Sequence, residues 1–277
     1  MKKTDNNAGR TKMPKVSEKL LSAARSLGVA VFWIAVWEVG ARAVGNSLLL
    51  PTPHETVKRL CEIALTDEFV RCTAMSLLRV CIGIISGIAA GVLTAALCSA
   101  VRIADRLVSP FMTVIKTTPV ASFIILALVW LGTSPLPAFI SFLMVYPLIF
   151  TNVRAGIKSV DPEILRMAQL FELSPLTMIR RIYAPAAYSH FVTSVKASLG
   201  LAWKAGIAAE VLAAPKYSIG SMLYRSKVYF ETTDLFAWTL VIILFSLMIE
   251  LAVGRLFDCA ARRKRRTGQG AGDKNEA

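Results

Sequence analysis

Apolar residues in this chain form long unbroken runs instead of short alternating or helical stripes. Residues 80–101 contain no charged side chain, and residues 117–153 contain none over 37 positions. A run of 18 or more such residues is typical of a membrane span, and one span takes about 20 residues. The second run is therefore long enough to hold parts of two spans.

The runs and their Gly and Pro breaks predict an all-α membrane protein with about six transmembrane helices. The expected spans are residues 27–45, 78–101, 107–131, 137–157, 190–213 and 235–255. Residues 54–79 mix charged and apolar positions, which predicts an amphipathic helix on the outer membrane surface. Gly83, Gly87 and Gly91 leave one face of the second span without side chains, which favours close packing against another helix of the same chain.

Composition and charge support a membrane protein. Hydrophobic residues make up 55% of the 277 residues and charged residues 18%. Soluble domains carry about 25% charged residues, so an ordinary soluble enzyme is not expected. The formal net charge is +14, and residues 1–26 and 255–277 each carry seven Lys or Arg. Basic tails beside apolar spans indicate contact with the lipid bilayer, and we expect no nucleic acid as a partner.

The distribution of Lys and Arg predicts the orientation. With both termini in the cytoplasm, the segments on that side hold 21 Lys and Arg, against seven on the outer side. Cytoplasmic segments carry the excess of these residues, so we expect both termini in the cytoplasm. The expected organisation is a basic cytoplasmic tail (residues 1–26), a multi-pass membrane domain (residues 27–258) and a second basic cytoplasmic tail (residues 259–277).

The sequence lacks the usual signatures of metal, disulfide and nucleotide sites. Its five cysteines show no C-x-x-C spacing, and its two histidines, His54 and His190, belong to no cluster. It contains no G-x-x-x-x-G-K-[ST] motif for binding nucleotide phosphates. We therefore expect no metal or cofactor on this chain, and no catalysis by it.

The cytoplasmic segment between the fourth and fifth spans, residues 159–188, has the pattern of two short helices. Each begins with an N-capping residue followed by proline, the usual signal for a helix start. The signals are Asp161, Pro162 and Glu163 for the first helix, Ser174 and Pro175 for the second, and Pro185 as the limit of the second. The first helix carries an apolar stripe of Leu165, Ala168, Leu170 and Phe171. This pattern favours a docking element for another protein, with a hairpin at the lipid surface as the alternative.

The same segment resembles the EAA coupling motif of bacterial ABC importer permeases. That motif runs E-A-A, then a Gly, then I-x-x-P. The matching residues are Ala168, Ile182 and Pro185. The departures are Arg166, Met167 and Glu172, which stand where the motif has its Glu, its first Ala and its Gly.

Other short motifs resemble the nitrate, sulfonate and taurine subfamily of these permeases. They are Leu49–Pro53, Ser76–Val80, Thr118–Ala121, Trp130–Gly132, Trp203 and Ala209–Glu210. Their order extends the resemblance from about residue 30 to residue 258.

The resemblance implies a type I ABC importer permease that works as a homodimer in the inner membrane of a bacterial cell. It implies one cytoplasmic ABC ATPase under each loop and an external solute-binding protein, with ATP and magnesium bound by the ATPase. It implies a small organic or inorganic anion as substrate, such as a sulfonate, nitrate or taurine, with a thiamine or pyrimidine precursor as the alternative. The implied ATPase-coupling residues are Asp161, Pro162, Glu163, Arg166, Met167, Ala168, Phe171, Glu172, Ser174, Pro175, Ile182 and Pro185.

Charged residues inside spans are costly and indicate function, so Lys204, Glu210 and Lys116 are candidates for the translocation path. Lys204 either faces the path and attracts an anion, or snorkels or pairs with a carboxylate elsewhere. Glu210 either shapes an outer gate or pairs with a cation on another span. Lys116 lies nearer the inner boundary, where snorkelling is the simpler explanation.

Two other classes of membrane protein fit the sequence less well. An ion-coupled secondary transporter typically has repeated halves, and the two halves of this chain show no similarity. It also leaves the structured segment 159–188 unexplained. A membrane-embedded enzyme would need ionisable residues clustered at one cavity, and no such cluster is visible in the sequence. An ABC importer permease is the favoured interpretation.

Overall fold

The computed structural model describes residues 15–272 and, apart from Ser26 and Asp258, the side chains between Arg25 and Cys259. It confirms the all-α class, because the described residues form helices and no strand. The helices are α1 (Lys15–Val44), α2 (Pro53–Ala64), α3 (Asp67–Ala100), α4 (Arg102–Thr117), α5 (Val120–Leu131), α6 (Leu136–Lys158), α7 (Pro162–Leu170), α8 (Pro175–Met178), the π-helix η1 (Ile179–Tyr183), α9 (Ala184–Ala213), α10 (Ile219–Val228) and α11 (Thr232–Gly272). Most side chains of the predicted tails, residues 1–26 and 259–277, lie outside the described set.

Helix α6 is at the centre of the bundle and packs along both α3 and α9. The glycine face of α3 makes the first contact possible. A Cβ atom on Gly83 would lie 2.2 Å from the carbonyl oxygen of Ala138, and one on Gly87 would lie 2.9 Å from Cβ of Val145. Gly91 repeats this close approach one turn later. The predicted packing within one chain is therefore confirmed.

Helix α9 is held between α6 and α11. Ser141 donates a hydrogen bond from Oγ to the carbonyl of Ala202 over 3.1 Å. Trp203 is fully buried, and its Nε1 donates to the carbonyl of Ile242 on α11 over 3.0 Å. A Cβ on Gly206 would lie 2.5 Å from Oγ of Ser141, so the close contact with α6 depends on this glycine.

The predicted span over residues 107–131 is not one straight helix, because α4 and α5 meet at a bend of 107°. Thr118 and Pro119 have extended backbones, with ψ of 131° and 134°. The helical region is unfavourable for a residue before proline, and proline supplies no N–H to continue the helix. Helix α5 has 12 residues, which is about 18 Å and too short to cross a hydrocarbon core of about 30 Å.

Among the described residues, four helical segments are long and apolar enough to cross a membrane. They are Leu27–Val44, Asp67–Ala100, Leu136–Lys158 and Thr232–Phe257, and the bent pair of α4 and α5 makes up to five. The remaining predicted span, residues 190–213, lies within α9. That helix has 30 residues, but it also carries Lys196, Lys204 and Glu210, which lower its apolar character.

The prediction of one amphipathic helix over residues 54–79 is wrong. Helix α2 ends at Ala64, and Thr66 then caps a new helix by accepting a hydrogen bond from the backbone N–H of Phe69. The later part of the segment is therefore the beginning of α3, which is 34 residues long. The charge pattern alone suggests one helix. The side-chain hydroxyls of Thr52 and Thr66 each cap the start of a separate helix, so the segment is divided in two.

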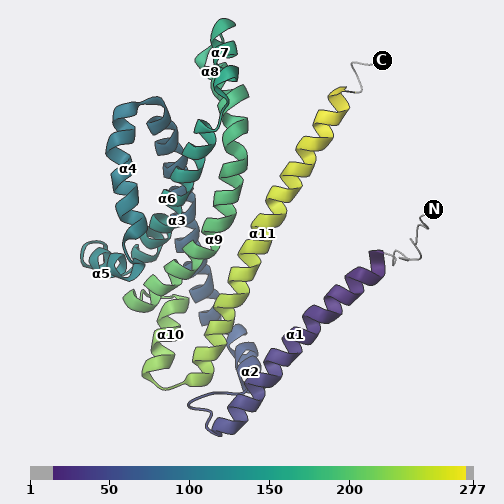
Figure 1. The fold of residues 1–277 in the computed structure, drawn as a ribbon. Coiled ribbons are helices and arrows are strands. Elements are labelled where there is room, and N and C mark those ends of the chain that lie inside the picture. The colour runs from purple at the N-terminus through teal and green to yellow at the C-terminus, as the bar shows by residue number, and fades with distance from the viewer. Residues whose placement is uncertain (1–14, 273–277) are drawn as a thin grey trace, which may run out of the picture.

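Figure 1 shows the elements sorted to the two ends of the bundle. Helices α7 and α8 lie at one end, and the C-terminal end of α11 points the same way. Helices α2 and α10 lie at the opposite end. Helices α1 and α11 lean away from the bundle, and Leu27, Phe32 and Trp33 on α1 are well exposed. Such an outward apolar face suits lipid.

Candidate functional site

The first short helix of the 159–188 segment begins and ends as a capped unit. Asp161 accepts a hydrogen bond from the N–H of Glu163 over 2.8 Å, which confirms the predicted start. At the other end, Leu173 N–H donates to the carbonyl of Ala168, and Glu172 N–H donates to that of Gln169, each over 3.0 Å. These two bonds form a Schellman motif.

The residue that closes this motif is Glu172, with a left-handed φ of 46°. Glycine is the usual residue at such a position, because a Cβ in that region costs about 1–2 kcal/mol. Glu172 also occupies the position where the EAA motif has its Gly. The turn geometry is thus retained although the glycine is lost.

The prediction that Pro185 limits the second short helix is wrong. Helix α8 continues through η1 into α9, and Ala184 N–H donates to the carbonyl of Ile179, five residues earlier. This π-turn changes the hydrogen-bond register, so that Pro185 falls in the first turn of α9, where a missing N–H costs nothing. Ser174 caps the start of this continuous helix as predicted.

The two capped helices expose an apolar surface at their end of the bundle. Leu170 is 83% exposed and Phe171 is 73% exposed. Arg166 and Met167 are also exposed on α7, whereas Ala168 is buried, so it belongs to the inner side of α7. Ile182 is half-buried and Pro185 is exposed. We call Met167, Leu170 and Phe171 the α7 surface.

An ionic cluster joins α4 to the base of this segment. Arg154, near the end of α6, donates a hydrogen bond to the carboxylate of Asp105 on α4. Lys158, in the last turn of α6, lies 3.7 Å from the same carboxylate, and Ser109 donates to it over 3.1 Å. Movement of the α7 end of α6 is thereby linked to the bent pair α4–α5.

A second polar cluster is buried at the other end of the bundle, around Glu210. Glu210 is fully buried, and its Oε1 lies 3.5 Å from Nη1 of Arg79, which is 7% exposed. Ser76 donates to Oε2 of Glu210 over 2.7 Å. Of the two alternatives for Glu210, pairing with a cation on another helix is the one present in the structure.

The same cluster fixes the chain that follows α9. Arg79 donates to the carbonyls of Lys216 and Tyr217, each over 3.0 Å. Gly220, in the first turn of α10, donates its N–H to Glu210 over 3.2 Å, and a Cβ there would lie 2.3 Å from that of Glu210. Sequence reasoning missed Arg79 as part of this site, although the Ser76–Val80 and Ala209–Glu210 motifs contained the signal.

The two candidate lysines lie on different helices, Lys116 on α4 beside the bend and Lys204 on α9. Lys116 donates to Oγ1 of Thr151 and lines a cavity of about 310 Å³ together with Thr118 and Leu201. Lys204 is exposed, and no hydrogen bond or ion pair joins it to another described residue. It lies one turn beyond Leu201, on the same face of α9. Of the two candidate lysines, Lys116 therefore lines this cavity, and Lys204 follows the lining residue Leu201 on α9.

A helical membrane bundle with an exposed two-helix segment at one end defines a permease-like transport subunit. The chain belongs to the family of binding-protein-dependent transport system inner membrane components, which it matches over residues 87–266. This family comprises permease subunits of ABC importers, and these subunits are not themselves catalytic. Because it is a family of inner membrane components, the chain is a multi-pass membrane protein. The predicted family is confirmed.

Two curated relatives agree with the predicted subfamily. The aliphatic sulfonates transport permease SsuC of Bacillus subtilis is 25% identical over 232 residues, covering 83% of this chain and 80% of that protein. The taurine transport permease TauC of Escherichia coli is 24% identical over 237 residues, covering 82% and 85%. A bacterial alginate ABC transporter, solved with its pentasaccharide-bound periplasmic protein, has the same fold, with a TM-score of 0.59, 16% identity and coverage of 90% and 96%.

Proposed function

We propose that this chain forms the translocation path of an ATP-driven importer and that an ABC ATPase docks on the α7 surface. The observation that carries the proposal is the exposure of Leu170 and Phe171 on a segment capped at both ends. Exposed apolar side chains on a rigid helix are suited to a protein partner. The ATPase binds ATP and magnesium, and this chain binds neither.

The rest of the assembly follows from that docking. The α7 end of the bundle lies in the cytoplasm, together with both termini, in agreement with the excess of Lys and Arg there. A solute-binding protein approaches the opposite end, where α2 and α10 lie. Two copies of the chain form a homodimer around one path in the bacterial inner membrane.

The substrate proposed is a small anion of the sulfonate or taurine type. Lys116 supports it, because it places a positive charge in the wall of the cavity at the α4–α5 bend, and Lys204 adds an exposed positive charge on α9. The names of the relatives SsuC and TauC support the same class. Intramembrane cations are typically found where an ion pathway or binding site needs them.

The experiment is a mild-detergent pull-down of this chain from native membranes, followed by mass spectrometry. We expect an ABC ATPase to be recovered in equal amount with this chain, together with a solute-binding protein after gentle crosslinking. The small molecule bound to the solute-binding protein then identifies the substrate. If that molecule is a pyrimidine precursor and not an anion, the anion proposal is overturned.

Uptake measurements separate this proposal from the ion-coupled transporter. We expect uptake to survive an ionophore and to stop when ATP is depleted. The proposal would be overturned by two results together. Uptake would stop when the ionophore is added while ATP is maintained, and no ATPase would be recovered from the same membranes.

A further inference from the structure

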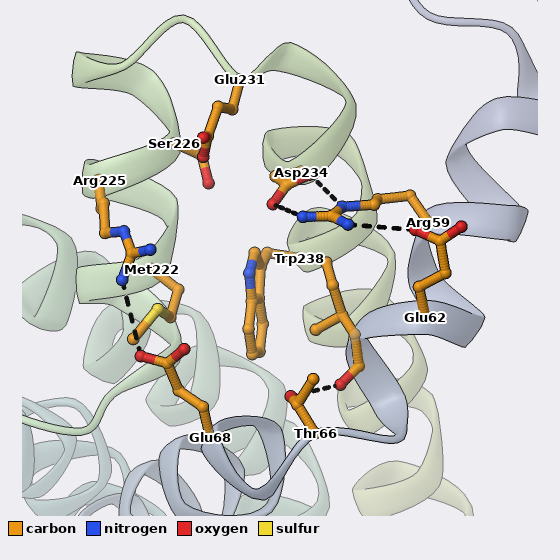
Figure 2. Close-up of a pocket in the computed structure, with 11 residues that line it drawn as sticks. Arg59, Glu62, Thr66, Glu68, Met222, Arg225, Ser226, Glu231, Asp234 and Trp238 are labelled. Atoms are coloured by element: carbon orange, nitrogen blue, oxygen red, sulfur yellow. Dashed lines mark hydrogen bonds and ion pairs between the residues drawn. The ribbon is translucent and has the colours of Figure 1, made fainter.

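A polar cavity of about 140 Å³ lies at the end of the bundle opposite α7. Its walls come from α2, from the start of α3, from α10 and from the start of α11. Figure 2 shows Trp238 standing in the middle of it, between Arg225 on one side and Arg59 on the other. We call this space the α2–α10 pocket.

On one side of the pocket, Arg59 is paired with two carboxylates. Arg59 donates to both carboxylate oxygens of Asp234, over 2.6 and 2.9 Å, and to Glu62 over 3.1 Å. These bonds raise the pKa of Arg59, with the hydrogen bond to Asp234 as the largest cause. Arg59 is therefore fixed as a structural link between α2 and α11.

The other side holds carboxylates with little compensation. Glu68 has only a long ion pair with Arg225, at 3.7 Å, and Glu231 has no ion pair with any described residue. Over the whole pocket, four acidic residues face two arginines, which leaves two negative charges in excess. The pocket is therefore suited to a positive group.

Two further features of this side indicate an occupant. Ser226 lines the pocket and is 4% exposed, yet its Oγ makes no hydrogen bond to another described residue. This hydroxyl is therefore available to a group that enters the pocket. Trp238 is also 4% exposed and stacks on Phe69, with ring centroids 5.5 Å apart.

The position of Glu231 is fixed by the backbone. Its N–H donates to the carbonyl of Ser226 over 2.9 Å, and Phe230 before it has a left-handed φ of 59°. This Schellman-type turn ends α10 and holds Glu231 beside Ser226, as Figure 2 shows. The turn fixes the backbone from which the Glu231 side chain extends into the pocket.

We propose that the α2–α10 pocket receives one Lys or Arg side chain of the solute-binding protein. This proposal rests on the proposed function, which brings that protein to this end of the bundle. The cation pairs with Glu231 and Glu68, donates a hydrogen bond to Oγ of Ser226, and lies against the Trp238 ring, which attracts cations. A space of about 140 Å³ admits one side chain and no larger segment.

The test measures binding of the co-purified solute-binding protein to the whole transporter in lipid nanodiscs. We expect the double variant Glu68→Gln and Glu231→Gln to weaken that binding about tenfold or more, mainly through faster dissociation. Asp67→Asn is the matched control. Asp67 is exposed, stands next to Glu68 and lies outside the pocket, so its loss removes a similar charge and leaves binding within about twofold.

A charge exchange then identifies the partner side chain. We expect Glu231→Lys to abolish binding, and one Lys→Glu or Arg→Glu variant of the solute-binding protein to restore it. Unchanged binding by the double variant, or an equal loss in Asp67→Asn, would overturn the pocket proposal alone. Failure of the wild-type transporter to bind any solute-binding protein would instead overturn the proposed function.

Discussion

Arg79 on α3 and Glu210 on α9 form an ion pair of 3.5 Å inside the bundle, and both side chains are almost completely buried. Neither charge has another opposite charge within ion-pair distance among the described residues. The pair therefore holds α3, α9 and the start of α10 together at the end opposite α7.

Removing one member of this pair is expected to destabilise the protein strongly. Breaking a buried ion pair costs about 3–5 kcal/mol, because the remaining charge is left uncompensated. We expect Glu210→Gln and Arg79→Met each to lower the thermal stability of the purified protein. The double variant is expected to lose less than the sum of the single losses, and strict additivity would contradict the pairing.

Phe171→Asp is expected to separate ATP hydrolysis from transport. It replaces an exposed aromatic side chain on the α7 surface, and losing such an anchor costs about 2 kcal/mol, or roughly 30-fold in affinity. We expect the variant protein to insert into the membrane normally. We expect less ATPase to be recovered with it in the pull-down, and its substrate uptake to be lost. Leu65→Asp is the control, because Leu65 is 90% exposed at the opposite end. Ala168→Glu is also expected to lose coupling, but Ala168 is buried, so this variant is expected to disturb the turn as well.

Glu172→Gly is expected to stabilise the turn after α7. The left-handed backbone at φ 46° strains any residue with a Cβ, so glycine relieves about 1 kcal/mol. Glu172→Val is expected to make the turn less stable than it is with Glu172, because a β-branched residue tolerates the left-handed backbone region least. Limited proteolysis of residues 159–188 measures both effects, and greater protection in the valine variant would contradict the assigned geometry.

Gly87→Ala is expected to destabilise the bundle by about 1–3 kcal/mol, since its Cβ would meet Val145 at 2.9 Å and force the helices apart. Gly200→Ala is the matched control on α9, because no atom lies within 4 Å of a Cβ there. That control is expected to be neutral or slightly stabilising, as alanine favours helix more than glycine. Thermal unfolding in nanodiscs measures both, and equal shifts would argue against a close α3–α6 contact.

Glu55 is expected to titrate at a lower pH than an ordinary glutamate. The backbone N–H of Thr52, followed by its side chain, lowers the pKa of Glu55 from the usual 4.5. A carboxyl with a depressed pKa stabilises the folded state above its unfolded pKa, and this contribution is lost as the pH falls through the folded pKa. The capping box of α2 is thus complete at neutral pH. Thr52→Val is expected to move the titration of Glu55, followed by NMR, back toward the ordinary value.

The apolar runs predict most of the helices because a span needs a long uncharged segment whatever it packs against. The bend at Thr118–Pro119 was not predicted, since proline is tolerated in many spans and only its neighbours decide whether the helix breaks. The continuation through Pro185 was missed for the opposite reason, because a π-turn leaves no local composition signal.

The capped start at Asp161 was predicted correctly because a cap depends on a few adjacent residues. The pairing of Arg79 with Glu210 could not be derived in the same way. It joins helices that are distant in sequence, and a lone intramembrane carboxylate does not identify its partner. Only the folded arrangement of α3, α9 and α10 shows that two separate motifs form one cluster.

The unbroken helix through α8, η1 and α9 has a mechanical consequence. From Pro175 to Ala213 it is roughly 55–60 Å long, about twice the thickness of the hydrocarbon core. Backbone hydrogen bonds run along its whole length, through the change of register at the π-turn. Since its far end is tied to Arg79 and Gly220, we expect a displacement applied at Ser174 to be felt at α10, on the opposite face of the bundle.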